Sequence, residues 1–334
     1  MTNETLAGYA NVSLYSAMAV FTIAMLCYAV YLAGLLPARD RAGDRESELA
    51  VDRDRELVSA GAPSEAATTS VTGASRPGRP EESDIPSRAR AAAGIGATTT
   101  WLGGMLLVLS IALRGLSVDW WPLGNMFEFA VMGSMFTSIA FSIWATKRDL
   151  RWLGLFITGP ILLVLGMAVR VWYTEAAELL PSLQSYWLVI HVTVAVLASA
   201  IFTLGAAASA VYLVKDAFAR SGRSSFLDRF PDAPSLERTA YGLHIVAFPL
   251  WTFTLIAGAI WAREAWASYW NWDPKEVWTF VIWVVYAAYL HSRATSGISR
   301  QTATYIALAG YACIIVNFAV VNVFFVGQHS YSGL

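Results

Sequence analysis

The sequence predicts an all-α integral membrane protein, a bundle of about eight transmembrane helices with both chain ends outside. Three observations indicate this fold class. The chain of 334 residues is 56% hydrophobic and only 14% charged, with a mean hydropathy of +0.50, whereas soluble domains contain about 25% charged residues. It holds repeated apolar runs long enough to cross a bilayer, and its basic residues gather between alternate runs. This composition excludes a soluble enzyme, a disordered scaffold and a nucleic-acid-binding protein.

The apolar runs define the predicted helices, because a helix needs about 20 apolar residues to cross about 30 Å of hydrocarbon. Eight segments meet this requirement: 14–36, 96–116, 127–146, 152–172, 187–214, 240–262, 277–293 and 302–326. The first has no basic residue before it and is longer than the apolar part of a signal peptide. We therefore expect residues 1–36 to form a retained N-terminal transmembrane helix.

Residues 37–95 differ from the rest of the chain in composition. They are rich in Arg, Asp, Glu, Ser, Ala and Pro. Such a segment cannot bury enough apolar surface to offset the entropy lost on ordering, so we expect a largely disordered cytoplasmic linker that serves as a tether or as a docking segment for a partner. Residues 96–334 then form a seven-helix domain.

Basic residues orient the chain, because cytoplasmic loops carry an excess of Lys and Arg. Residues 1–13 contain neither, and placing them outside puts 19 of the 23 basic residues in the inner segments. Only Arg114, Arg170, Arg263 and Lys275 fall on the outer side. Both termini are therefore expected outside.

The segment between the sixth and seventh predicted helices is unusually rich in tryptophan. Seven of the 14 tryptophans lie between residues 251 and 283, and five of them within 18 consecutive residues. Trp266, Trp270 and Trp272 lie within the seven residues before Asp273. Tryptophan is common at membrane interfaces, but this density also suits a platform for a large, flat, apolar ligand with charged substituents. From composition, an interfacial belt and a ligand platform both stay open.

Two of the four histidines fall on the same predicted outer face. His191 lies near the outer end of the fifth predicted helix, and His329 follows the eighth. Two neutral imidazoles beside a tryptophan-rich shelf can ligate one haem iron. His291 lies about 22 Å along the seventh helix from Glu276. At that depth it is either a functional residue or a histidine that only packs against its neighbours. His244 receives no role.

The outer arginines Arg114, Arg170 and Arg263 lie at the ends of predicted spans. Guanidinium groups there could hold haem propionates. The alternative is that each side chain extends toward lipid headgroups, and the sequence does not rank the three.

Residues 266–276, WASYWNWDPKE, closely resemble the tryptophan-rich WWD signature of haem-handling proteins in cytochrome c biogenesis. Within that group the chain resembles the CcsA (ResC) family of system II cytochrome c synthases. Residues 187–192, 290–293 and 329–331 match that family's pattern, and residues 124–128 do so more loosely. The resemblance covers about residues 98–334 and makes 96–334 a haem-handling WWD domain.

The resemblance implies a ligand set. His191 and His329 would be the external axial ligands of haem b, bound as a substrate over the shelf of Trp266, Trp270, Trp272 and Asp273. His291 would belong to a second, membrane-embedded site through which haem passes. The other ligand of that second site would lie on a ResB-like membrane subunit.

The resemblance also implies a reaction, that of a holocytochrome c synthase of the haem-lyase type, active with the ResB-like partner. The two haem vinyl groups would be joined to the thiols of a CxxCH segment of apocytochrome c. This would take place on the extracytoplasmic face of the bacterial cytoplasmic membrane, and a thioredoxin-like thiol reductant is a further expected partner. No catalytic residue stands out, since Asp273 and Glu276 are candidates for a general acid by position only.

Two alternatives accompany this reading. One is a haem exporter or chaperone of the CcmC type, which passes haem to a carrier without making thioether bonds. The other is a membrane assembly subunit that binds no ligand and whose tryptophans form only an interfacial belt.

Overall fold

The computed structural model describes residues 3–59, 85–178, 184–221 and 230–329. Within these ranges the chain is helical apart from its connections and contains no strand. Seven helices are long and apolar enough, by length and composition, to cross a membrane. The predicted fold class, an all-α bundle of membrane-spanning helices, is therefore confirmed.

The helices are numbered in chain order, with short 3₁₀ and π-helical segments between some of them. They are α1 (Glu4–Ser59), α2 (Ser87–Val118), α3 (Met126–Ala145), the 3₁₀ turn η2 (Arg151–Leu153), α4 (Gly154–Arg170), α5 (Tyr186–Arg220), α6 (Ala233–Trp266), α7 (Pro274–Ala294), α8 (Arg300–Ile315), the π-helical segment η5 (Val316–Val321) and α9 (Asn322–Phe324).

Helix α7 covers the predicted span 277–293 but is not among the seven helices that meet the requirements for crossing a membrane. It is 21 residues long, so length is sufficient. Its mean hydropathy is lowered by several tryptophans and tyrosines and by polar residues at both ends, Lys275 and Glu276 in the first turn and His291 and Arg293 in the last. The described chain thus has eight long helices, of which seven are apolar enough to span.

The predicted linker 37–95 is helical at both ends, which corrects the expectation of disorder for those stretches. Helix α1 continues to Ser59, and α2 begins at Ser87. Residues 38–59 contain no proline and are rich in Ala, Arg and Glu, which have high intrinsic helix propensity, and they extend a helix that is already nucleated. Residues 60–84 lie outside the described residues.

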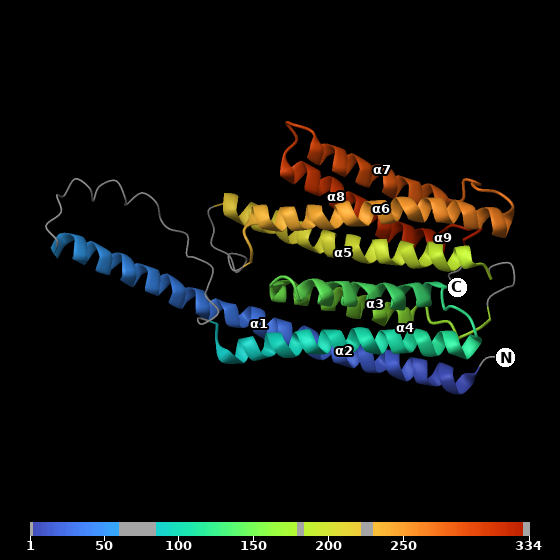
Figure 1. The fold of residues 1–334 in the computed structure, drawn as a ribbon, viewed down its shortest axis with the longest axis horizontal. Helices are drawn as coiled ribbons and strands as arrows, with labels where there is room; N and C mark the ends of the chain where they lie inside the picture. The colour runs from blue at the N-terminus through green and yellow to red at the C-terminus, as the bar shows by residue number, and fades with distance from the viewer. Residues whose placement is uncertain (1–2, 60–84, 179–183, 222–229, 330–334) are drawn as a thin grey trace.

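The helices form two groups that share α5 (Figure 1). One apolar core joins α1, α3 and α4 with Val196 and Leu204 of α5. A second core joins α6, α7 and α8 with Phe202 of α5, which stacks on Tyr286 of α7 at a ring-centroid distance of 3.8 Å. Because α5 contributes to both cores, it fixes the position of one group against the other.

One end of the bundle collects the starts of α1, α3, α5 and α7 and the ends of α2, α4 and α6 (Figure 1). We call it the site end. The N–H of Asn3 donates to the carbonyl of Ser117 over 2.7 Å there. The four basic residues predicted outside all lie at this end. Three are near the ends of α2, α4 and α6, and the fourth, Lys275, is in the first turn of α7. Its assignment to the outer side of the membrane stays a prediction.

Helices α1 and α2 approach closely at Gly103. A Cβ atom at this position would lie 2.8 Å from the ring of Phe21, which is fully buried in the first core. The ring of Tyr28 occupies the equivalent space at Gly154 of α4. Because real Cβ contacts do not come this close, α1 can pack this tightly only against glycine.

We expect Gly103→Leu to lower the free energy of unfolding by about 1–3 kcal/mol, because the larger side chain must displace Phe21. Gly94, on the same helix, faces open space, so Gly94→Leu is expected to be neutral or stabilising through its higher helix propensity. Thermal unfolding of the two detergent-solubilised variants, followed by circular dichroism, checks this. Equal midpoints would contradict it.

Candidate functional site

A pocket opens at the site end between the two helix groups. It is lined by the start of α3, the first turns of α5, the last turns of α6, the first turns of α7 and parts of η5 and α9, together with His329. The space between the lining residues is about 1170 Å³ when the open mouth is included. Most of the lining is apolar. Both His191 and His329 belong to it.

His191 is held by two features of α6. Its Nδ1 lies 3.0 Å from the carbonyl oxygen of Thr254, and its ring stacks on Trp261 at 5.9 Å between centroids with 13° between planes. A Cβ atom at Gly258 would lie 2.7 Å from the His191 ring, so the ring fits here only because residue 258 is glycine. Since a carbonyl only accepts, Nδ1 carries the proton and Nε2 carries the lone pair.

His329 is held by a carboxylate in a similar way. Its Nδ1 lies 2.9 Å from Oδ1 of Asp273, which fixes the same tautomer, with the lone pair on Nε2. The His329 ring meets Trp266 at 4.7 Å and Trp261 at 5.7 Å between centroids. Trp261 therefore contacts both histidines from one side of the pocket. Ser330 and Tyr331, which belong to the same predicted motif, lie outside the described residues.

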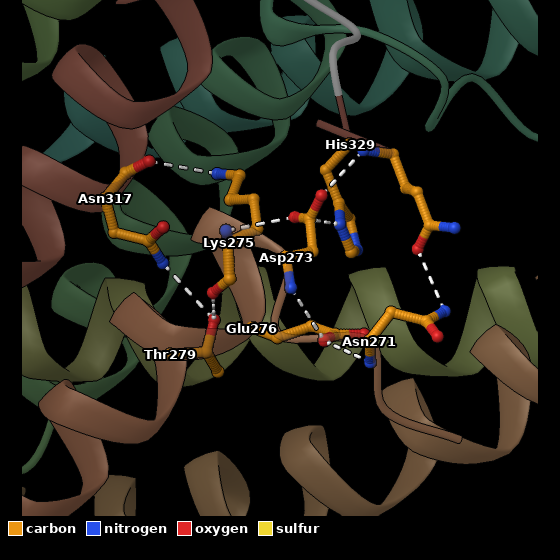
Figure 2. A network of polar contacts seen from close by, with 8 residues as sticks. Asn271, Asp273, Lys275, Glu276, Thr279, Asn317 and His329 are labelled. Carbon is orange, nitrogen blue, oxygen red and sulfur yellow. Dashed lines mark hydrogen bonds and ion pairs between the residues drawn. The ribbon is translucent and has the colours of Figure 1, made fainter. Parts of the chain in front are cut away.

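Asp273 also begins α7. Its Oδ1 accepts from the backbone N–H of Lys275 over 3.0 Å, and its Oδ2 accepts from the N–H of Gln328 over 2.6 Å. Glu276 completes a capping box, because its Oε2 accepts from the N–H groups of Asp273 and Asn271 over 3.1 and 2.8 Å. Figure 2 shows this network, in which one aspartate joins the start of α7 to the segment that carries His329.

The environment of Asp273 favours its ionised form. Burial alone would raise the pKa of its carboxyl group, but the hydrogen bond from His329 and the N–H groups of Gln328 and Lys275 together hold the pKa below its usual value. Asp273 is therefore an anion that both caps a helix and accepts from a histidine.

The predicted tryptophan shelf is divided between the pocket and its surroundings. Trp270 lines the pocket together with Trp251 and Trp261 of α6. Trp266 packs behind, between Trp261 and His329, with ring centroids 4.7 Å from each. Trp272 is 76% exposed and adopts a left-handed backbone with φ of 57°, a conformation that is uncommon for a bulky residue.

Lys275 extends along the wall of the pocket. Its Nζ donates to the carbonyl oxygen of Asn317 in η5 over 3.0 Å (Figure 2). The Asn317 amide in turn reaches Oγ1 of Thr279 over 3.4 Å. Lys275 precedes the predicted span of α7, and burial lowers its pKa to about 7, an effect that nearby Asp273 only partly opposes.

The three arginines predicted at the site do not line the pocket. Arg114 is buried, with its Nε 2.7 Å from Oε1 of Glu128 and its guanidinium donating to the carbonyl of Thr174 over 2.7 Å. Arg170 is exposed, and exposed Arg263 donates to the carbonyl of Ala267 over 2.9 Å. Their predicted contact with propionates finds no support in this geometry.

The other two histidines lie apart from this pocket. His291 is exposed and occupies the last turn of α7, at the opposite end of that helix from Asp273. His244 is fully buried in α6, near Ser209 of α5 and the rings of Tyr286 and Tyr289. The structure therefore separates His291 from the pair His191 and His329, as predicted from spacing.

Sequence reasoning counted Trp251 and Trp261 within the tryptophan-rich segment without assigning them to the site, and it missed Thr254 and Gly258. Trp251, Thr254, Gly258 and Trp261 are spaced by three or four residues, so they share one face of α6, and this periodicity could have identified them. No local signal marks Asn317, because its role depends on Lys275, which is 42 positions away in the sequence.

We expect Asp273→Ala to lower the free energy of unfolding by about 1–3 kcal/mol, because it removes a helix cap and a charged hydrogen-bond acceptor. Asp232 provides the matched control: it precedes α6 in the same N-cap position but makes no side-chain cap hydrogen bond, so Asp232→Ala should be close to neutral. Unfolding followed by tryptophan fluorescence measures both variants.

The effect of Asp273→Ala should also depend on pH. Because the folded-state pKa is lowered, the stabilisation is present above the unfolded value of about 3.9 and is lost as the pH falls through the folded value. A difference from wild type that persists unchanged in acid would contradict this account.

Comparison with known proteins agrees with this geometry. Residues 120–329, which contain the whole pocket, match the family described as "Cytochrome C assembly protein". The chain is 31% identical to "Cytochrome c biogenesis protein CcsA" of Guillardia theta over 262 residues, 72% of this chain and 86% of that protein. It is 33% identical to the protein of the same name from Prochlorococcus marinus, over 65% of this chain and 79% of that protein. The Pyropia yezoensis protein is 30% identical, with 70% and 86% covered. The chain therefore belongs to the cytochrome c assembly protein family and is a multi-pass, CcsA-type cytochrome c biogenesis protein.

Proposed function

We propose that the chain holds haem b as a substrate in the site-end pocket, between His191 and His329, and promotes its attachment to apocytochrome c. One observation carries this proposal. Both histidines line a single pocket, and each is anchored through Nδ1 to an acceptor, Thr254 or Asp273. Histidines that ligate metals almost always donate their other ring N–H to a carbonyl or a carboxylate, which orients the ring and raises its basicity.

The rest of the pocket fits a porphyrin. Its largely apolar lining suits a flat macrocycle. Trp261 contacts both histidine rings, and Trp251 and Trp270 add flat aromatic surface to the lining. A simple interfacial belt does not require tryptophan side chains turned inward beside two anchored histidines, so a ligand platform is the better supported of the two interpretations.

In the proposed reaction, each thiol of a CxxCH segment adds across one haem vinyl group. A carbon–sulfur bond forms, the thiol proton passes to the other vinyl carbon, and no electrons are gained or lost overall. The contribution of this chain is to hold the macrocycle with its vinyl edge accessible, because placing thiol and vinyl in contact supplies much of the rate. Two axial imidazoles also occupy both iron positions that oxygen could take.

The partners follow from the reaction. The CxxCH thiols must be reduced before they react, and a thioredoxin-like protein would keep them so. His291 is exposed in the last turn of α7, where it can face a neighbouring subunit, and this supports a second haem site completed by a ResB-like protein. The concentration of basic residues in the inner segments supports orientation of the pocket toward the extracytoplasmic side of the bacterial cytoplasmic membrane.

We expect the purified wild-type protein to show a Soret absorption band with haem, and the double variant His191→Ala, His329→Ala to lose it, because both axial nitrogens are removed. Gly258→Leu should weaken the band by displacing the His191 ring, whereas Gly242→Leu, on the same helix but facing open space, should not. An unaltered band in the double variant would rule out these ligands. Absence of any band in wild type would favour an assembly subunit that binds no ligand.

Attachment itself is tested with a reporter. Wild type co-expressed with a ResB-like protein and a CxxCH-bearing polypeptide should yield covalent haem on the reporter, detected by haem staining after denaturation. A reporter with both cysteines replaced by alanine is the matched control. If haem copurifies with the chain but never becomes covalent, the synthase proposal fails and a CcmC-type haem exporter or chaperone takes its place.

A further inference from the structure

We infer that Lys275 receives a carboxylate of the haem and so sets which edge of the macrocycle faces α7. This inference rests on the proposed function, because it concerns the same pocket. Haem b carries two propionate groups on one half of the ring and two vinyl groups on the other. A cation that pairs with a propionate therefore orients the reactive half away from itself.

Lys275 is the one lysine or arginine among the described residues that line the pocket. Arg114 is already paired with Glu128, and exposed Arg170 and Arg263 lie outside the lining. A dicarboxylate entering this largely apolar space would leave an anion without a partner unless a cation is present. Lys275 is in position to supply that cation.

The ammonium group of Lys275 is not neutralised by the protein in the part of the chain that is described. Its hydrogen-bond acceptor is the neutral carbonyl of Asn317, and no described carboxylate lies within ion-pair distance of it. An ammonium has three donors, so one bond to Asn317 leaves capacity for a ligand. Burial lowers the pKa of Lys275. A bound anion would oppose that effect by favouring the charged form of the amine.

Of the two carboxylates nearest Lys275 in sequence, Asp273 has both oxygens occupied and Glu276 has one. Both oxygens of Asp273 accept hydrogen bonds, from His329 and Lys275 N–H on one oxygen and from Gln328 N–H on the other. Glu276, which also lines the pocket, uses Oε2 for the backbone at the start of α7, and its buried Oε1 has no hydrogen-bond partner among the described residues. These bonds hold the anions on the side of α7 where its helix begins, while the Lys275 side chain extends toward η5 (Figure 2).

Position relative to the histidines completes the argument. His191, His329 and Lys275 all line the same pocket. A ring held between the two histidines would therefore share its cavity with the Lys275 side chain, which reaches the wall formed by η5. The propionate edge then faces α7 and η5, and the vinyl edge faces the opposite wall.

The experiment compares two ligands, haem and haem dimethyl ester, in which both carboxylates are masked. Each is titrated by absorption into the purified, detergent-solubilised full chain, and the signal of the His191→Ala, His329→Ala variant is subtracted to remove partition into detergent. Wild type should bind haem about tenfold or more tightly than the ester, as for a charged hydrogen bond. Lys275→Met should lose this preference by binding haem more weakly and the ester unchanged.

Arg170→Met is the matched control, a cation at the same end of the bundle outside the pocket, and should keep the wild-type preference. Equal affinity of wild type for both ligands would overturn the inference, even if the Lys275 variant does not fold. So would a Lys275→Met protein that loses haem and ester equally, since Lys275 would then act only by joining α7 to η5, or loss of the preference in Arg170→Met. If wild type binds neither ligand, the proposed function itself has failed.

Discussion

The site depends on a single carboxylate. Asp273 begins α7, accepts from the backbone beside His329 and accepts from the His329 ring itself. Three groups are thus positioned by one side chain: the first turn of α7 with Lys275, the backbone at Gln328 and a proposed axial ligand. Because the same atom, Oδ1, serves both the helix and the histidine, the geometry of the ligand cannot change without disturbing the start of the helix.

The two helix groups meet around this arrangement. His191 lies on α5, the helix that contributes to both apolar cores, and Thr254, Gly258 and Trp261 of α6 fix its ring. The other histidine comes from the opposite end of the sequence. Both histidines come from the group formed by α5 to α9, and the start of α3 adds a wall from the other group. The family match over residues 120–329 covers all of these elements.

Much of the fold and part of the site follow from local sequence. The spans can be predicted because a bilayer requires apolar helices of about one length. Since successive spans alternate in direction, the same pattern predicts His191 and His329 at one end of the bundle. Arg114 was misassigned because its partner Glu128 lies on another helix, and charge type alone does not reveal pairing. The sequence places Lys275 among the charged residues of the tryptophan-rich segment, but its bond to Asn317 depends on how η5 meets α7 and has no local signal. The helix over residues 38–59 differs from the expected disorder. A low apolar content shows that a segment cannot form a core of its own, but it does not exclude a helix formed by residues of high helix propensity.

The two histidines are anchored to unlike acceptors, a neutral carbonyl for His191 and an anion for His329. A carboxylate draws more electron density onto an imidazole ring than a carbonyl does, so the lone pair on His329 is the stronger donor. A metal between them would have one strongly and one weakly bound axial position. The weakly bound side, that of His191, is then where a histidine from an incoming polypeptide would exchange at lower cost.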